Sequence, residues 1–179
     1  PNAFFAEKKE IVDISYAGDI VGLHDTGNFK IGDTLTQGEA LNFKGVPSFS
    51  PEHFRYINNA DPMKAKQLDK GISQLMDEGV AQLFTLEMNN RKIIGTVGAL
   101  QYEVIQYRLE HEYGAKCTYE NLPVHKACWV EPKDANSEEF KEFKRVKQKF
   151  LAKDKQGQLV FLADSSFSIQ MTQQKYPNV

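Results

Sequence analysis

The chain is poor in cysteine and has no long run of apolar side chains. Cys117 and Cys128 are its two cysteines, too few for a disulfide scaffold, so the sequence indicates a reduced, cytoplasmic setting. No apolar segment reaches the length of about 20 residues that a membrane-spanning helix needs, and no signal peptide is recognisable. We therefore expect a protein with no membrane partner.

The sequence also lacks an excess of charge of either sign. Its net charge is -2, so no overall positive field would attract nucleic acid, and any basic binding surface must be local. There is no Gly-x-x-x-x-Gly-Lys phosphate loop and no dinucleotide fingerprint. We expect this chain to bind no nucleotide and no other cofactor by itself.

Residue combinations that could support catalysis or metal binding are incomplete. His111 and Glu112 lack the second histidine, four positions after the first, that a zinc-protease helix needs. His125 and Cys128 have the spacing of metal ligands, but no second pair completes a four-ligand site. The serines at 165–166 follow a predicted strand, where a turn or helix cap explains them. The sequence predicts no catalytic, cofactor-binding or metal-binding residue.

Residues 1–48 are rich in β-forming residues that alternate with Gly-Asp turns. Short strands at this spacing are typical of a small β-barrel. Since 48 residues are too few to close a typical barrel, we interpret the segment as part of a β-barrel in a longer protein. The expected elements are strands at 11–14 and 20–23 with a turn at 17–19, a turn at 25–28, and a segment at 31–35.

A stiff connector, Pro47 to Pro51, separates this segment from a second one, 49–179, in which strands and helices alternate. Its order of strand, helix, strand, strand, helix, strand is the split βαβ, or ferredoxin-like, arrangement, an antiparallel sheet with both helices on one face. The fold class is therefore α+β. The strands are expected at 54–58, 80–86, 92–98 and 115–119, and the helices at 61–79 and 99–114.

Both expected helices carry signals at their ends. Asp61 and Pro62 are a typical N-cap and first helical residue, and Gly79 and Gly114 are typical C-terminal caps. The first helix has one apolar stripe, formed by Leu68, Ile72, Leu75 and Met76.

The second helix is apolar on two sides. Leu100, Val104 and Tyr107 share one face, and an opposite face is formed by Tyr102, Ile105, Leu109 and Tyr113. A helix with two apolar faces is expected to be covered on both. We predict that Leu100 and Leu109 are both buried, one of them under a further part of the chain.

An αβ extension follows, and it is the candidate for that second cover. Residues 125–130 and 159–163 are expected strands, and the tail at 167–176 is expected to be helical. Asn136 and Glu139 form a capping box that starts another helix. One side of that helix is apolar, with Phe140, Phe143, Val146 and Phe150.

The same predicted helix contains the one strongly charged segment, since residues 141–155 carry seven basic and two acidic side chains. On a helix whose other side is apolar, they form a basic outward face. That face is either an ordinary solvated surface or a contact with the phosphates of ribosomal RNA. The candidate contact residues are Lys144, Arg145, Lys147 and Lys149.

Several segments resemble known proteins. Residues 17–23 and 32–35 resemble the second-domain β-barrel of translational GTPases. The more specific segments are similar to bacterial peptide chain release factor 3, and the resemblance covers essentially the whole chain. They are residues 43–55, 61–68, 75–82, 97–104 and 174–179.

The resemblance implies a GTP-dependent factor that binds the ribosome after peptide release and removes the class I release factor. GTP and Mg²⁺ would be held by a GTPase domain preceding Pro1, so this stretch would have no catalytic domain although the full-length protein is expected to be a GTPase. Residues 1–48 would be the end of the second domain and 49–179 the third domain. Its partners would be ribosomal RNA and proteins, with class I release factors affected indirectly, and it would act as a monomer.

Two alternatives are open. One is another translational GTPase of the elongation or ribosome-protection type, against which Ala99-Leu100-Gln101 argues, because elongation factor G has a different turn there. The other is an acylphosphatase-type enzyme on the same fold. That chemistry needs an arginine in the loop after the first strand, whereas residues 59–62 are Asn-Ala-Asp-Pro.

Overall fold

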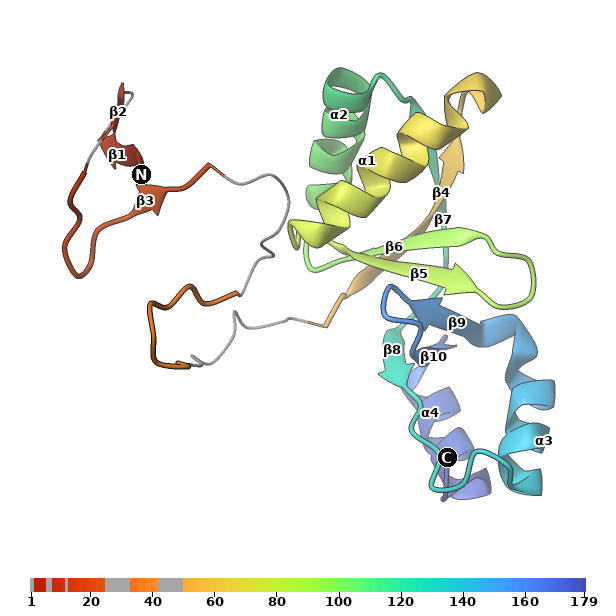
Figure 1. The fold of residues 1–179 in the computed structure, drawn as a ribbon. Coiled ribbons are helices and arrows are strands. Elements are labelled where there is room, and N and C mark those ends of the chain that lie inside the picture. The colour runs from red at the N-terminus through yellow and green to blue at the C-terminus, as the bar shows by residue number, and fades with distance from the viewer. Residues whose placement is uncertain (1, 6–7, 12, 25–32, 42–49) are drawn as a thin grey trace. The chain divides into compact units, whose positions relative to one another are not determined.

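The computed structural model describes residues 2–5, 8–11, 13–24, 33–41 and 50–179 (Figure 1). The chain divides into two compact units, Pro1–Val46 and Pro47–Val179. No helix within the described residues is long and apolar enough to cross a membrane.

The described part of the first unit contains a three-stranded antiparallel sheet in the order β2-β1-β3. Its strands are β1 (Asn2–Phe5), β2 (Lys8–Ile11) and β3 (Val21–Gly22). The predicted turn at 17–19 is confirmed: the Asp19 N–H donates to the Tyr16 carbonyl at 3.0 Å, and the Tyr16 N–H donates to the Asp19 carboxylate at 2.8 Å. Gly18 has φ of +97°, which few other residues adopt.

The strand predictions in this unit need correction. The strand expected at 11–14 ends at Ile11, because β1 pairs with residues 8–11. Local β-propensity does not show which residues a partner strand will pair with, so the predicted bounds were wrong. The strand expected at 20–23 is reduced to Val21–Gly22. Thr34 and Leu35 lie in no strand, and the predictions for 25–28 and 31–32 fall outside the described residues.

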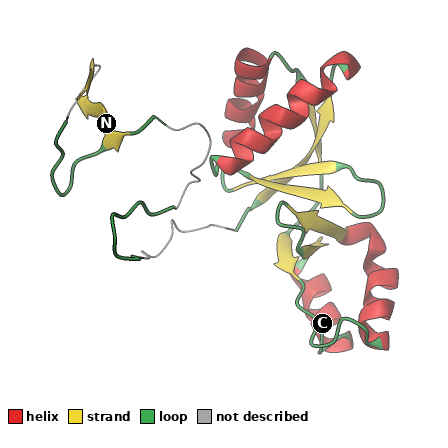
Figure 2. Cartoon of the chain, in the orientation of Figure 1, coloured by secondary structure: helices red, strands yellow, loops and turns green. Residues whose placement is uncertain are grey.

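The second unit begins with the predicted split βαβ arrangement, which confirms the α+β fold. Four antiparallel strands lie in the order β7-β4-β6-β5. Helices α1 and α2 cover one face of this sheet (Figures 1 and 2). The elements are β4 (His53–Asn59), η1 (Pro62–Lys64), α1 (Ala65–Asp77), β5 (Gln82–Leu86), β6 (Lys92–Thr96), α2 (Gln101–Tyr113) and β7 (Cys117–Asn121).

The predicted helix signals are confirmed. The Asp61 side chain accepts from the Met63 N–H at 3.0 Å, and Pro62 is the first helical residue. Gly79 follows the end of α1 with φ of +75°. Gly114 caps α2 in the left-handed conformation, and its N–H donates to the Glu110 carbonyl at 3.1 Å. Helix caps depend on residues close by in the sequence, which is why the helix ends could be predicted from the sequence.

The C-terminal extension adds three strands to the β5 edge and so completes a seven-stranded antiparallel sheet, β7-β4-β6-β5-β9-β10-β8. Helices α3 and α4 belong to this addition (Figure 1). The elements are β8 (Lys126–Trp129), α3 (Glu138–Lys147), η2 (Gln148–Phe150), β9 (Leu151–Asp154), β10 (Leu159–Ala163) and α4 (Ser166–Lys175).

Two predictions in the extension were wrong in detail. The basic helix ends at Lys147, and residues 151–154 form β9 because Leu151 and Ala152 are buried in pairings with β10 and β5. The N-cap of α3 is Ser137, one residue later than the predicted Asn136. The Ser137 hydroxyl oxygen accepts from the Phe140 N–H at 3.2 Å, whereas the Asn136 N–H donates to the Asp134 carboxylate at 2.8 Å.

The sheet is strongly curled. Strands β7 and β8 are its opposite edges, yet only residues 122–125 connect them. Those five Cα steps span at most about 18 Å, whereas six strand spacings across a flat sheet would measure about 29 Å. The edges must therefore approach one another. The sheet remains open, since the described strand pairings include none between β7 and β8.

Three groups of buried side chains stabilise this arrangement. The first fills the space between the sheet and helices α1 and α2 and includes Ile72 of α1 and Leu109 of α2. The second lies on the opposite, inner face of the curled sheet and includes Phe54, Phe84 and Ala127, which come from strands on both sides of its centre. The third lies between α3, α4 and the added strands. The extension therefore has a core of its own.

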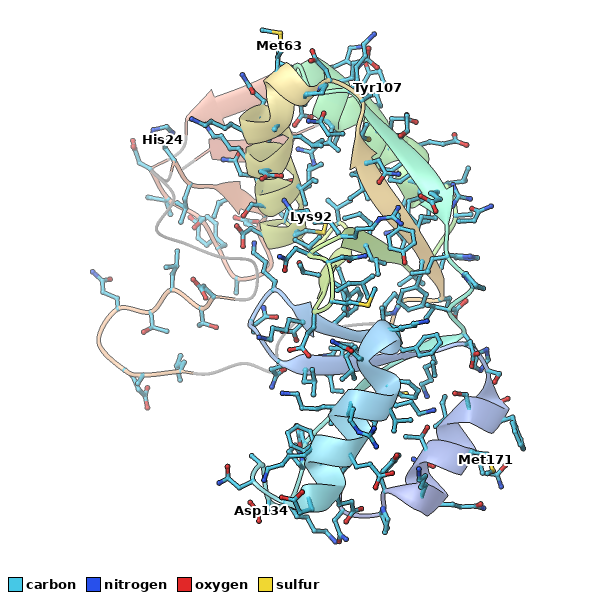
Figure 3. All side chains as sticks on the ribbon, turned by 90° about the vertical axis from the view of Figure 1, so that its right-hand side faces the viewer. His24, Met63, Lys92, Tyr107, Asp134 and Met171 are labelled. Atoms are coloured by element: carbon cyan, nitrogen blue, oxygen red, sulfur yellow. The ribbon has the colours of Figure 1, made fainter. Side chains whose placement is uncertain are left out.

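The predicted cover over the second face of α2 was wrong. Leu109 is fully buried as predicted, but Leu100 is 73% exposed, and Val104 and Tyr107 are exposed beside it. The extension continues the sheet edge at β5 and β9, at the opposite end of the unit from the outer side of α2 where Tyr107 lies (Figures 1 and 3). The apolar outer face of α2 has no cover within the described residues.

Candidate functional site

Most of the acidic residues of α3 lie at its N-terminal end and most of its basic residues lie at its C-terminal end. Ser137 caps its N-terminus, Glu138 and Glu139 lie in the first turn, and Lys144, Arg145 and Lys147 lie in the last turn. Negative charge near the N-terminus and positive charge near the C-terminus both interact favourably with the helix dipole. The sequence therefore concentrates cations at the C-terminal end of α3, and η2 adds Lys149 to them.

Packing fixes which side of α3 faces outward. Phe143 is buried, with its ring centroid 6.1 Å from that of Phe161 on β10 and 5.5 Å from that of Tyr176 after α4. Both contacts are edge-to-face, a favourable geometry for aromatic rings. With Phe143 held inward, the side chains of Lys144, Arg145 and Lys149 are exposed, and Lys147 is half-buried.

The seven basic residues of the 141–155 segment fall into two groups. Three are neutralised: Lys141 pairs with Glu138 at 2.6 Å, Lys153 pairs with Glu87 at 3.5 Å, and Lys155 pairs with Asp77. The other four form no ion pair with any residue that the structure describes. These four, which we call the α3 cations, are the four candidate residues from the sequence: Lys144, Arg145, Lys147 and Lys149.

Two of the α3 cations lie against aromatic rings. The Lys144 ammonium is 5.6 Å from the centroid of Phe140, and the Lys147 ammonium is 5.2 Å from that of Phe161. Contacts of this length are weak at exposed positions and leave the ammonium hydrogens available. The rings thus restrict where the two charges lie without neutralising them.

A surface hollow adjoins this group, lined by Glu87, Lys144, Arg145 and Gln148. Glu87 is the acidic residue of the lining, and its carboxylate is the one that pairs with Lys153. The charge of Glu87 is therefore largely balanced from the β9 side. A hollow with an ammonium and a guanidinium at its edge can hold a phosphate group.

Helix α3 is tied to α4 by Glu142. Its carboxylate accepts from the Lys175 ammonium at 3.0 Å and from the Tyr176 hydroxyl at 3.4 Å. The hydrogen bond from Lys175 is the main reason that the pKa of Glu142 is lowered, and the nearby charge of Arg145 adds to the effect. Glu142 is therefore ionised at neutral pH, and it holds the two helices in register.

The other combinations that the sequence raised are accounted for by local structure. Glu112 accepts from the Arg108 guanidinium at 2.7 Å, which lowers the pKa of Glu112, and the Tyr107 carbonyl lies 2.8 Å from His111 Nδ1. Burial raises the pKa of the Cys128 thiol, so that it stays protonated. Ser165 caps α4 as the sequence suggested, accepting from the Ser168 N–H at 3.1 Å. In the part of the chain that the structure describes, no three His, Cys, Asp or Glu residues gather as metal ligands.

Comparison with protein families identifies the second unit. Residues 43–173 match the family of the class II release factor RF3, C-terminal domain. The match extends over well more than half of the chain and includes α1, α2, α3 and the whole curled sheet. The chain belongs to the class II release factor RF3 family. The resemblance to release factor 3 is thereby confirmed for residues 43–173, and the β-barrel resemblance of residues 17–23 and 32–35 stays a prediction.

Membership of the RF3 family makes this chain part of a release factor, a class of protein in protein biosynthesis. It also decides against the two alternatives from the sequence, another translational GTPase and an acylphosphatase-type enzyme. In the second case the loop itself agrees. The Asp61 N–H donates to the Asn59 side-chain oxygen at 3.0 Å, the Asp61 side chain caps η1, and no arginine lies between β4 and η1. Helix α3 lies within the matched residues, so the α3 cations belong to the family domain itself.

Proposed function

We propose that this chain is the ribosome-binding C-terminal region of a GTP-dependent peptide chain release factor that acts in the cytoplasm and removes class I release factors from the ribosome after peptide release. Two findings support the proposal. The first is the RF3 family match over residues 43–173. The second is the group of four α3 cations, which form no ion pair in the described structure. This group is the reason for assigning the binding site to α3.

The proposed contact is with the phosphates of ribosomal RNA. Lysine and arginine side chains that neutralise phosphates release condensed counterions, which makes binding favourable at low salt and independent of base sequence. Because the net charge is -2, no field of the whole chain adds to this attraction, so it must come from local groups of basic side chains such as the α3 cations. Such a contact would orient the domain on the ribosome without reading a particular sequence.

We place GTP and Mg²⁺ on another part of the full-length factor. This chain contains no phosphate-loop motif, so none of its residues is proposed to hold either one. The role of this region would be to engage the ribosome as a monomer while the nucleotide state changes elsewhere in the factor.

The test is a full-length factor in which Lys144, Arg145, Lys147 and Lys149 are all replaced by glutamine. Affinity for ribosomes is measured over a range of salt concentrations. We expect weaker binding, a plot of log affinity against log salt that is shallower by about 3 to 4, since each phosphate contact contributes about 0.9, and an unchanged melting temperature, because exposed charges add little stability.

A matched variant controls for the general loss of positive charge. Lys64, Lys66, Lys70 and Lys126 are also exposed and form no ion pair among the described residues, so replacing these four by glutamine removes the same charge elsewhere. This control is expected to keep most of the salt dependence. Equal slopes for the two variants would contradict a specific role for α3.

A further inference from the structure

The uncovered face of α2 carries a continuous apolar stripe. Leu100, Val104 and Tyr107, which we call the α2 stripe, are 73%, 50% and 62% exposed. They are separated by four and three residues, so they lie in line on one side of the helix. The His111 ring stacks on Tyr107 with centroids 3.9 Å apart and extends the line to about 16 Å. An apolar surface of this form is the footprint of one short helix.

The stripe is held on a rigid support. On the inner side of α2, the Tyr102 hydroxyl donates to the carbonyl of Ile94 on β6 at 2.8 Å. Near its C-terminal end, the Arg108 guanidinium donates to Glu78, directly after α1, at 2.5 Å, and to Glu112. A partner would therefore meet a preformed surface, which reduces the entropy lost on binding.

The charges beside the stripe are acidic. Glu103 is exposed and forms no ion pair with any described residue, and Glu110 is paired only at the surface, with Lys116 at 3.2 Å. The single arginine of α2, Arg108, is already bonded to two carboxylates. RNA phosphates and anionic lipid headgroups would be repelled by this rim. A second copy of the chain would bring the same carboxylates together.

We propose that the α2 stripe binds a basic amphipathic protein helix. Its apolar side chains would cover Leu100, Val104 and Tyr107, and its lysine or arginine side chains would meet Glu103 and Glu110. The choice of partner rests on the proposed function: the helix belongs to the protein component of the ribosome, while RNA phosphates meet the α3 cations. The domain then engages RNA and protein through two different faces.

The first test replaces both Leu100 and Tyr107 by serine in the full-length factor. Affinity for ribosomes is expected to fall about tenfold or more, because apolar burial is lost, while the salt slope and the melting temperature stay unchanged. The matched control replaces Phe167 and Met171 by serine, since these α4 side chains are 69% and 47% exposed. It should bind as the unaltered factor does. Equal affinity for both double variants would overturn the inference.

The second test identifies the partner by photo-cross-linking with p-benzoylphenylalanine in place of Tyr107. The expected product joins the factor to a basic ribosomal protein. A product with ribosomal RNA, with a second copy, or within the factor itself would overturn the inference. If the unaltered factor fails to bind ribosomes, the proposed function falls as well; if it binds and the stripe variant binds equally, only the present inference fails.

Discussion

Replacing Leu109 by alanine is expected to lower the free energy of unfolding by about 2–5 kcal/mol, the usual cost of a large-to-small change in a packed core. Leu109 is fully buried in the core between the sheet and helices α1 and α2. It also packs tightly against Gly71 of α1, since a Cβ added at Gly71 would come 2.7 Å from its Cδ2 atom. Little rearrangement could fill the space that Leu109 leaves.

The matched control is Leu100→Ala on the same helix. Because Leu100 is largely exposed, its loss should change the free energy of unfolding by less than about 0.5 kcal/mol. Urea denaturation followed by circular dichroism measures both variants. Similar destabilisation of the two would mean that the outer face of α2 is covered within this chain, contrary to the structure.

Replacing Phe143 by alanine is expected to cost about 3–5 kcal/mol, the range for a buried aromatic side chain. Phe143 forms edge-to-face contacts with Phe161 and Tyr176 and so joins α3 to β10 and to the chain after α4. Its loss should also weaken ribosome binding at every salt concentration, because the α3 cations would no longer be held in one arrangement. Thermal unfolding followed by the fluorescence of Trp129, the one tryptophan, measures the stability change.

The control for this change is Phe167→Ala, which removes an exposed ring from α4. It should leave both the melting temperature and the ribosome affinity close to those of the unaltered protein. If Phe143→Ala were as mild as Phe167→Ala, the extension would not have the core described for it, and α3 would be positioned by other contacts.

Much of the second unit could be predicted because its signals are local. Asp61, Gly79 and Gly114 act on residues within one turn of themselves, and the apolar stripe of α1 follows from helix periodicity. Strand β9 could not be predicted in this way. Its four residues lie inside a basic segment, and they become a strand by pairing with β5 and β10. The exposure of the outer face of α2 could not be predicted either. Its apolar pattern is visible in the sequence, but whether another segment packs on that face depends on residues far away in the chain.

The candidate site also has a part that could be predicted from the sequence and a part that could not. The number of basic residues in α3 can be counted from the sequence, and the pairing of Lys141 with Glu138 is a local helical contact. The partners of Lys153 and Lys155 are Glu87 and Asp77, more than sixty residues away in the chain. Only the fold therefore shows which cations are neutralised within the domain and which can meet an external anion.

The most direct test of the central proposal is to locate α3 on the ribosome. A hydroxyl-radical source tethered to a cysteine introduced at Lys149 would cleave RNA strands near the α3 cations in the complex of full-length factor and ribosome. The same source on a cysteine introduced at Lys66 of α1 is the comparison, since α1 and α3 lie at opposite ends of the second unit (Figures 1 and 3). If the α3 cations bind ribosomal RNA, strong RNA cleavage is expected from position 149 and much weaker cleavage from position 66. Cleavage from position 66 alone, or equal cleavage from both, would contradict the proposed contact.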